Sequence, residues 1–252
     1  MKQLSFLLTI IILFFLTGCS KGSSSPTNPP NENSLDSGLI AYYPFSGNAN
    51  DASSNKYNLV VQGATLTTDH FGNANKAYHF NGTNAIMQVP KFLVAKSLEF
   101  FSVSAWVKPE DATLAPIFGL TGAPYYEDRL ERLGIYKDDA TNEFNASCFI
   151  TNYSNTGSTS IAFNNIIDDP SNQWMHLVVV HSSLGIYMYI NGVKADNYVA
   201  PTSYFPVDYS NGGVIGGALL NSSTTYFKGD LDEIRFYNRA LTETEIKKLY
   251  QQ

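Results

Sequence analysis

The chain has 252 residues, a formal net charge of −6, 16 tyrosines, 16 phenylalanines and 18 glycines. This composition favours strands and turns and argues against a helical bundle. No basic stripe accompanies the modest negative charge, which excludes nucleic acid as the expected partner. The length suits one β-sandwich domain with an ample core once the N-terminal segment is set aside.

The N-terminus has the pattern of an export signal. A short positive start is followed by the apolar run Leu4–Leu16 and then by Leu16-Thr17-Gly18-Cys19, which resembles the bacterial lipobox. The run is too short for a comfortable membrane span. The resemblance implies that residues 1–18 are a lipoprotein signal peptide and that Cys19 is diacylated, which gives stable anchoring. An ordinary secretory signal with a chance cysteine is the alternative.

The anchor has consequences for location and for the next segment. Ser20 is not the aspartate that often marks inner-membrane retention, so we expect a lipid-anchored, extracytoplasmic protein of the bacterial cell envelope, in the outer membrane. Residues 19–37 are rich in Ser, Pro and Asn and predict a flexible tether. With Cys19 lipidated, Cys148 has no partner and is expected to be a small core residue. One domain then covers residues 38–252.

Alternating apolar residues and turn signals predict a series of strands along this domain. Asn191-Gly192 is the sharpest turn signal, a two-residue hairpin that needs positive φ at both positions. Met175–Val180 is apolar on both faces, as in a central strand covered on both sides. The predicted strands are Leu39–Phe45, Asn58–Val61, Ala77–Phe80, Ala85–Val89, Phe101–Lys108, Ala115–Leu120, Leu130–Tyr136, Phe144–Ile150, Thr159–Phe163, Met175–His181, Ile186–Ile190, Val193–Asn197, Gly213–Gly217 and Phe227–Tyr237.

The last strand is followed by a short capped helix. Thr242 is a good N-cap, and Glu245 three residues later completes a capping box. Leu241 before the cap and Ile246 after it have the spacing of a hydrophobic staple. Ile246 and Leu249 give the helix one apolar face.

Several of these segments resemble, in order, a known family. The closing pattern G-D-L-D-E-I-R-F-Y-N-R-A-L-T-x-x-E-I resembles that of the laminin-G-like, concanavalin A-like jelly rolls. Leu39–Asp51, Ala77–Val89, Phe101–Pro109 and Trp174–Ala195 resemble the first strand, the F-x-G hairpin, the A-W-V strand and the long central hairpin of that family. The resemblance implies an all-β, two-sheet antiparallel jelly-roll sandwich with a short C-terminal helix.

The same resemblance implies function. The family consists mostly of glycan- and protein-binding modules, so we expect a non-catalytic lipoprotein that binds carbohydrate. A protein–protein module, such as an adhesin or an accessory subunit of a surface glycan-uptake complex, is the second hypothesis. A glycoside hydrolase is the third, but related glycosidases carry E-x-D-x-x-E on one strand. Neither Glu127–Glu131 nor Asp230–Glu233 has that spacing.

A structural calcium ion is the expected cofactor, because the available ligands are hard oxygens. Asn48, Asn50 and Asp51 in the first loop are predicted to close against Asp232 on the last strand. An Asx-rich turn without metal is the alternative. Glu127-Asp128 matches the position of a calcium-binding pair in the related pentraxins, but the loop Ala218–Thr225 lacks the further acids that those proteins use.

Exposed aromatic residues beside polar side chains are the pattern of a glycan site. Three loops carry aromatic residues, the third with Tyr204, Phe205 and Tyr209, and tyrosines packed over the sandwich edges are the alternative. The predicted ligand-binding residues are Tyr125, Tyr126, Glu127, Asp128, Asn152 and Tyr153.

Overall fold

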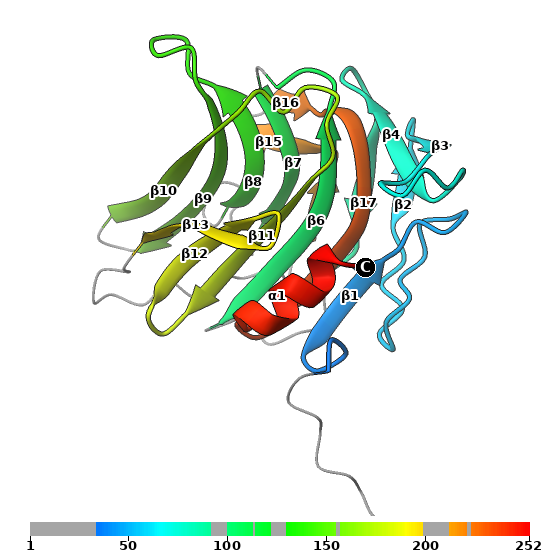
Figure 1. The fold of residues 1–252 in the computed structure, drawn as a ribbon, viewed down its shortest axis with the longest axis horizontal. Coiled ribbons are helices and arrows are strands. Elements are labelled where there is room, and N and C mark those ends of the chain that lie inside the picture. The colour runs from blue at the N-terminus through cyan, green and yellow to red at the C-terminus, as the bar shows by residue number, and fades with distance from the viewer. Residues whose placement is uncertain are drawn as a thin grey trace, which may run out of the picture. The chain divides into compact units, whose positions relative to one another are not determined.

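The computed structural model describes residues 34–91, 100–112, 114–121, 130–154, 157–198, 212–220 and 223–252. The predicted signal peptide, Cys19 and most of the tether lie outside these residues. Two antiparallel sheets and one helix make up the described domain (Figure 1). The predicted two-sheet sandwich with a short C-terminal helix is therefore confirmed.

The sheet that carries the helix, here called sheet A, has eight strands. The last strand of the chain lies near its centre, with the first strand hydrogen-bonded to it. Across the sheet the order is β13 (Val193–Tyr198), β12 (Gly185–Ile190), β11 (Met175–Ser182), β6 (Phe101–Pro109), β17 (Lys228–Tyr237), β4 (Ala77–Asn81) and β3 (Thr65–Thr67), and β1 (Leu39–Tyr43) pairs with β17.

The facing sheet, sheet B, has seven strands, and a small separate hairpin accompanies it. The hairpin consists of β15 (Gly217–Leu220) and β16 (Ser223–Tyr226). Sheet B runs in the order β10 (Gly157–Ile167), β9 (Phe144–Ser154), β8 (Leu130–Lys137), β7 (Leu114–Thr121), β14 (Gly213–Ile215), β5 (Ile86–Val89) and β2 (Val60–Gln62).

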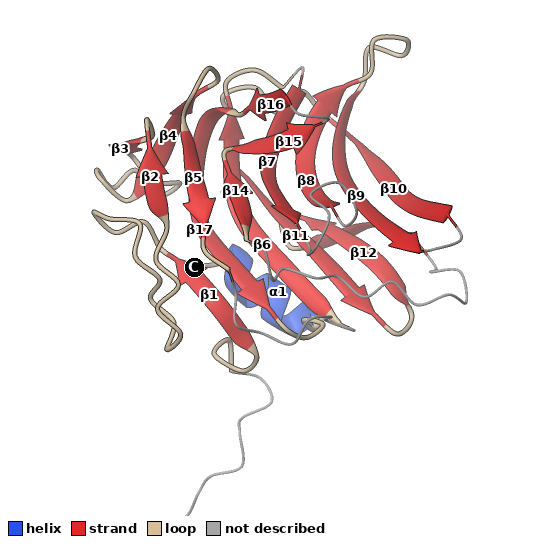
Figure 2. Ribbon diagram, turned by 180° about the vertical axis from the view of Figure 1, so that it is seen from behind, coloured by secondary structure: helices blue, strands red, loops and turns tan. Residues whose placement is uncertain are grey.

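The domain has two hydrophobic layers, one on each face of sheet A. Leu177 and Val179 of β11 point into the main core between the sheets. Val178 and Val180 point the other way, into a smaller cluster with Ile246 and Leu249 of α1 (Glu243–Tyr250). The helix lies over sheet A, and sheet B lies on the opposite side (Figure 2). This two-sided burial explains the unbroken apolar run in β11.

The sharpest local prediction is confirmed at the β12–β13 hairpin. Asn191 and Gly192 have φ values of 51° and 75°, so both central residues adopt the left-handed conformation that a type I′ turn requires. A Cβ on Gly192 would approach Cδ1 of Tyr250 to 3.2 Å, so the turn also lies close to the end of α1.

Four features of the strands differ from the sequence prediction. The strand β3 and the hairpin β15–β16 were not expected, because β3 and β16 are rich in Ser and Thr and β15 is only four residues long, which leaves little alternating hydrophobic pattern. The strand expected at Gly213–Gly217 ends early, because Gly216 takes φ of 79° where a Cβ would collide with the Phe80 ring. Strand β9 continues to Ser154, so Asn152 and Tyr153 lie in a strand and not in the predicted loop.

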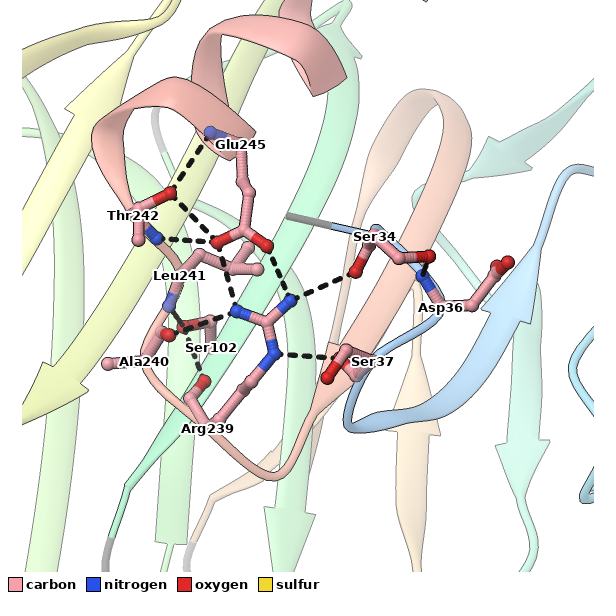
Figure 3. Close-up of polar contacts among 9 residues, drawn as sticks. All are labelled: Ser34, Asp36, Ser37, Ser102, Arg239, Ala240, Leu241, Thr242 and Glu245. Atoms are coloured by element: carbon pink, nitrogen blue, oxygen red, sulfur yellow. Dashed lines mark hydrogen bonds and ion pairs between the residues drawn. The ribbon is translucent and has the colours of Figure 1, made fainter. Parts of the chain in front are cut away.

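A buried ion pair ties the two ends of the domain together (Figure 3). The Arg239 guanidinium contacts both carboxylate oxygens of Glu245 at 2.6 and 2.9 Å. It also donates to the carbonyl oxygens of Ser34 and Ser37, residues that composition had assigned to the tether. Glu245 in turn accepts from the Thr242 backbone N–H, so the predicted capping box belongs to this clamp.

We predict that Glu245→Ala lowers the free energy of unfolding by about 3 kcal/mol, because it leaves the Arg239 guanidinium without its partner and removes half of the capping box. Urea unfolding followed by fluorescence measures the difference. Glu243→Ala is the matched control, since Glu243 is exposed in the first turn of the same helix. The control should change stability by no more than about 0.5 kcal/mol. Equal losses in the two variants would contradict the role of the clamp.

Candidate functional site

The predicted glycan-binding residues are not brought together by any contact that the structure describes. Tyr125, Tyr126, Glu127 and Asp128 lie outside the described residues. Asn152 and Tyr153 belong to β9, where their backbones pair with Thr159 and Ser158 of β10. Their assignment to the ligand site stays a prediction.

The predicted calcium loop is folded around the Asp51 carboxylate. Asp51 is 2% exposed and accepts hydrogen bonds from the backbone N–H groups of Tyr42, Ser53 and Tyr57, at 2.8–2.9 Å. The Ser53 hydroxyl donates a fourth hydrogen bond, at 2.7 Å. These are the contacts of an Asx-rich turn, in which N–H and O–H donors satisfy the carboxylate.

The two asparagines of this loop are exposed at its surface. Asn48 Oδ1 accepts from the Asn50 backbone N–H at 2.9 Å, which forms a second Asx turn. Within the described residues, no group of three or more His, Cys, Asp or Glu side chains has the arrangement of a metal site. Calcium binding through Asn48, Asn50, Asp51 and Asp232 therefore stays a prediction.

Asp232 has partners of its own on the outer face of sheet A. Its Oδ2 lies 2.9 Å from His70 Nδ1, and its Oδ1 accepts from the Glu233 backbone N–H. A bulge in the pairing of β17 with β6 follows Asp232, and Glu233 takes φ of 52° there. The bulge re-aims the neighbouring carboxylate, so that Glu233 accepts from the Tyr42 hydroxyl and pairs with Arg235.

The His70–Asp232 pair is buried, and burial changes how both groups titrate. Burial raises the pKa of Asp232 to about 6, although the hydrogen bond from His70 acts in the opposite direction and lowers this pKa. For His70, burial lowers the pKa, but hydrogen bonds to Asp232 and to the Gln252 carbonyl oxygen outweigh it and raise the pKa above the usual value. Both side chains therefore bind a proton more tightly in this pair than they do when free in water.

A stack of rings surrounds this pair. His70 lies on Trp106 with ring centroids 4.1 Å apart and an interplanar angle of 12°. Trp106 stacks in turn on Tyr250 of α1 and lies 5.3 Å from His176. Burial lowers the pKa of His176 to about 3, so this histidine is neutral and its Nε2 pairs with the Ser104 hydroxyl.

A pocket of about 460 Å³ opens beside this stack, where β10, β11 and β12 meet at one end of the sandwich. Its volume is within the range of small-molecule sites. Its wall combines apolar side chains with a half-buried tryptophan and a few polar groups. The residues of this wall used below are Ile167, Met175, Ile190, Trp174, Asp168 and Asn191.

The polar groups of the pocket are positioned by the backbone. Asn191 Oδ1 accepts from the His176 backbone N–H at 2.9 Å, which fixes the side chain, while its amide N–H groups have no partner among the described residues. The exposed Asp168 carboxylate also has no hydrogen bond within the described part of the chain. Asp169 differs, because hydrogen bonding by Ser171 holds the pKa of its carboxyl below the usual range.

Trp174 is the main aromatic surface of this pocket. Its ring meets His70 at 6.1 Å in a T-shaped arrangement, and Lys108 Nζ lies 6.0 Å from its centroid. An aromatic face next to a carboxylate and an amide suits a ligand that has both apolar C–H faces and hydroxyl groups. Sequence reasoning took Trp174 only as the start of the central hairpin. A tryptophan directly after the polar loop Asp168–Gln173 was the available signal.

The fold and this end pocket define a lectin-type β-sandwich. Residues 81–247 match the Laminin_G_3 family, described as the concanavalin A-like lectin/glucanases superfamily. The match covers more than half of the chain, and the chain belongs to this superfamily. The resemblance drawn from the sequence is thereby confirmed. No curated protein sequence matches the chain significantly.

Solved structures with the same fold include binding domains of several proteins. Domain 4 of AbnA, a GH43 extracellular arabinanase from Geobacillus stearothermophilus, in complex with arabinotriose, has a TM-score of 0.61 and 23% identity, covering 84% of this chain and 98% of that domain. The binding domain of botulinum neurotoxin DC in complex with rat synaptotagmin II has a TM-score of 0.57 and 14% identity, covering 86% and 52%.

The same neurotoxin DC binding domain, in complex with SialylT, has a TM-score of 0.60 and 13% identity, again over 86% of this chain and 51% of that one. The chain thus spans about half the length of the toxin domains. At these identities the likeness establishes the fold. Within the described residues, no helix has both the length and the apolar character needed to cross a membrane.

We predict that Asp51→Ala lowers the free energy of unfolding by about 3 kcal/mol, because four hydrogen bonds to a buried carboxylate are lost. The hydrogen bonds alone give the same loss in EDTA and in millimolar calcium, whereas the predicted calcium site would make the loss larger in calcium. Thermal melts of wild type and variant in both buffers measure it, with the exposed Asp139→Ala as control. If calcium raises the melting temperature of wild type but not of Asp51→Ala, the first loop binds the ion, since a ligand of the folded state stabilises it by mass action.

Proposed function

We propose that this protein is a non-catalytic, carbohydrate-binding lipoprotein and that the pocket at Trp174 holds the sugar. The observation that carries the proposal is the combination of a half-buried indole with the free Asp168 carboxylate and Asn191 amide. Sugars present C–H faces that pack on aromatic rings and hydroxyl groups that need both donors and acceptors. The arabinotriose complex of the structurally similar arabinanase domain agrees with this class of ligand.

The acids of the pocket favour binding over hydrolysis. A glycosidase needs one carboxyl group whose pKa is raised, so that it can donate a proton to the leaving group. Hydrogen bonding with Ser171 lowers the pKa of Asp169 instead. Asp168 and Asp169 are also exposed neighbours in one loop and do not face each other across a cleft, as a catalytic pair must.

A protein partner is the second candidate. The observation in its favour is a small exposed apolar surface on the edge strands β2 and β3, formed by Val60, Val61 and Leu66. The similar toxin domain was solved in complex with synaptotagmin II. The pocket favours a sugar, because its aromatic and polar groups converge in a hollow and do not form a flat apolar face.

The first residues of the described domain and the pocket lie toward opposite ends of strand β6 in sheet A. The Arg239 side chain donates hydrogen bonds to Ser34 and Ser37. The backbone carbonyl oxygen of Arg239 accepts a hydrogen bond from the Ser102 hydroxyl, at the start of β6. Met175 at the pocket pairs with Val107, near the other end of β6. The separation is about five residues of strand, or roughly 16 Å. The pocket is therefore separated from the residues at which the described domain begins.

We predict that Trp174→Ala weakens glycan binding by about 1–3 kcal/mol, because the ligand loses its aromatic contact. A glycan array identifies the ligand, and isothermal titration of the full-length protein in detergent measures the change. Tyr187→Ala is the control, since Tyr187 is a half-buried aromatic of β12 outside the pocket. An unchanged affinity in the tryptophan variant would remove the pocket as the binding site.

We predict that Cys19→Ala leaves the precursor without lipid and moves the protein out of the detergent-extracted membrane fraction. The reason is that the Leu-Thr-Gly-Cys motif supplies the only thiol near the end of the signal segment. Fractionation with metabolic fatty-acid labelling measures the change, and Cys148→Ala is the matched control. A variant that still partitions and labels like wild type would exclude lipid anchoring through Cys19.

A further inference from the structure

Phe71 is an exposed aromatic residue that the fold holds in one place. Its side chain is 64% exposed, yet its ring lies against His70 with centroids 4.1 Å apart. His70 is itself fixed by Asp232 and by the Gln252 carbonyl oxygen. A ring on such a support has little conformational freedom left to lose, which lowers the entropic cost of binding a ligand.

The backbone beneath Phe71 is also fixed. Asp69 is buried, and its carboxylate accepts from the backbone N–H groups of Phe71 and Asn73 and from the Asn73 amide, at 2.7–2.9 Å. The Asp69 carbonyl oxygen accepts from Gly72, and the Asp69 N–H donates to the Asn73 carbonyl oxygen. This closed turn holds Phe71 in solvent. The side chain therefore does not contribute to a hydrophobic core, which is the usual place of a phenylalanine.

The ring of Phe71 is continuous with the pocket. His70 lies between the two aromatic residues, 4.1 Å from Phe71 and 6.1 Å from Trp174. Trp174 lines the pocket, so the rings of Trp174, His70 and Phe71, here called the aromatic row, form a chain of contacts that begins at the pocket. Lys108, with its ammonium group 6.0 Å from the Trp174 ring, borders the same row.

We propose that Phe71 forms a second sugar subsite, and that the ligand is a linear oligosaccharide that extends from the pocket over His70 to Phe71. This inference rests on the proposed function of the pocket. A monosaccharide or disaccharide seated on Trp174 would leave Phe71 unused. A longer chain gains a second stacking contact on a ring that is already in position, and its affinity rises with length.

The test is the dependence of affinity on chain length. Arabino-, xylo- and cello-oligosaccharides of two to six residues are titrated into full-length protein in detergent. In wild type the hexasaccharide of the recognised series should bind about ten-fold more tightly than the disaccharide. Phe71→Ala should remove that gain and leave disaccharide binding unchanged, while Trp174→Ala should weaken every length.

Leu184→Ala is the matched control, because Leu184 is 72% exposed in a turn away from the row. Melting temperatures confirm folding, which a truncation at an exposed position should not disturb. A hexasaccharide that binds Phe71→Ala as tightly as wild type would overturn the second subsite while leaving the proposed function intact. Wild type that binds none of the three series would count against the proposed function and against the inference that rests on it.

Discussion

The hydrogen-bonded pairing of β17 near the centre of sheet A holds the rest of the domain in place. β17 pairs with β6 on one side and with β4 and β1 on the other, so it joins segments from both ends of the chain. Leu231 and Phe236 of this strand point into the main core, while Tyr237 faces the cluster under α1. Both hydrophobic layers therefore depend on one strand, and the Arg239–Glu245 clamp directly after it fixes the helix and the start of the domain.

The candidate site uses this rigidity. The bulge in β17 places Asp232 against His70, and His70 supports the aromatic row outside the pocket. Asp232 and His70 are each fixed by two neighbours, so the side chains that support the row are already in position in the folded domain. Preformed groups of this kind suit the glycan-binding role proposed above.

The polar groups on the outer face of sheet A show how burial is balanced by pairing. Asp232 and His70 satisfy each other, and Glu245 has a bidentate arginine partner. Burial, with smaller contributions from the charges of Arg235 and His70, lowers the pKa of His176 to about 3 and keeps this histidine neutral. A buried charge is tolerated where a partner is within hydrogen-bond distance and is avoided where none is present.

The sequence by itself determined the elements whose cause is local. Short sequence patterns predicted the Asn191-Gly192 turn, the Thr242 capping box and the two-sided apolar strand β11. The order of such segments along the chain indicated the family. Tertiary structure alone decided the site. Trp174, His70 and Phe71 are brought together by loops that are distant in the chain, and no periodicity links such residues. In the same way, the partners of Asp51 could be identified only from the folded structure, because a carboxylate can either bind calcium or accept hydrogen bonds from backbone N–H groups.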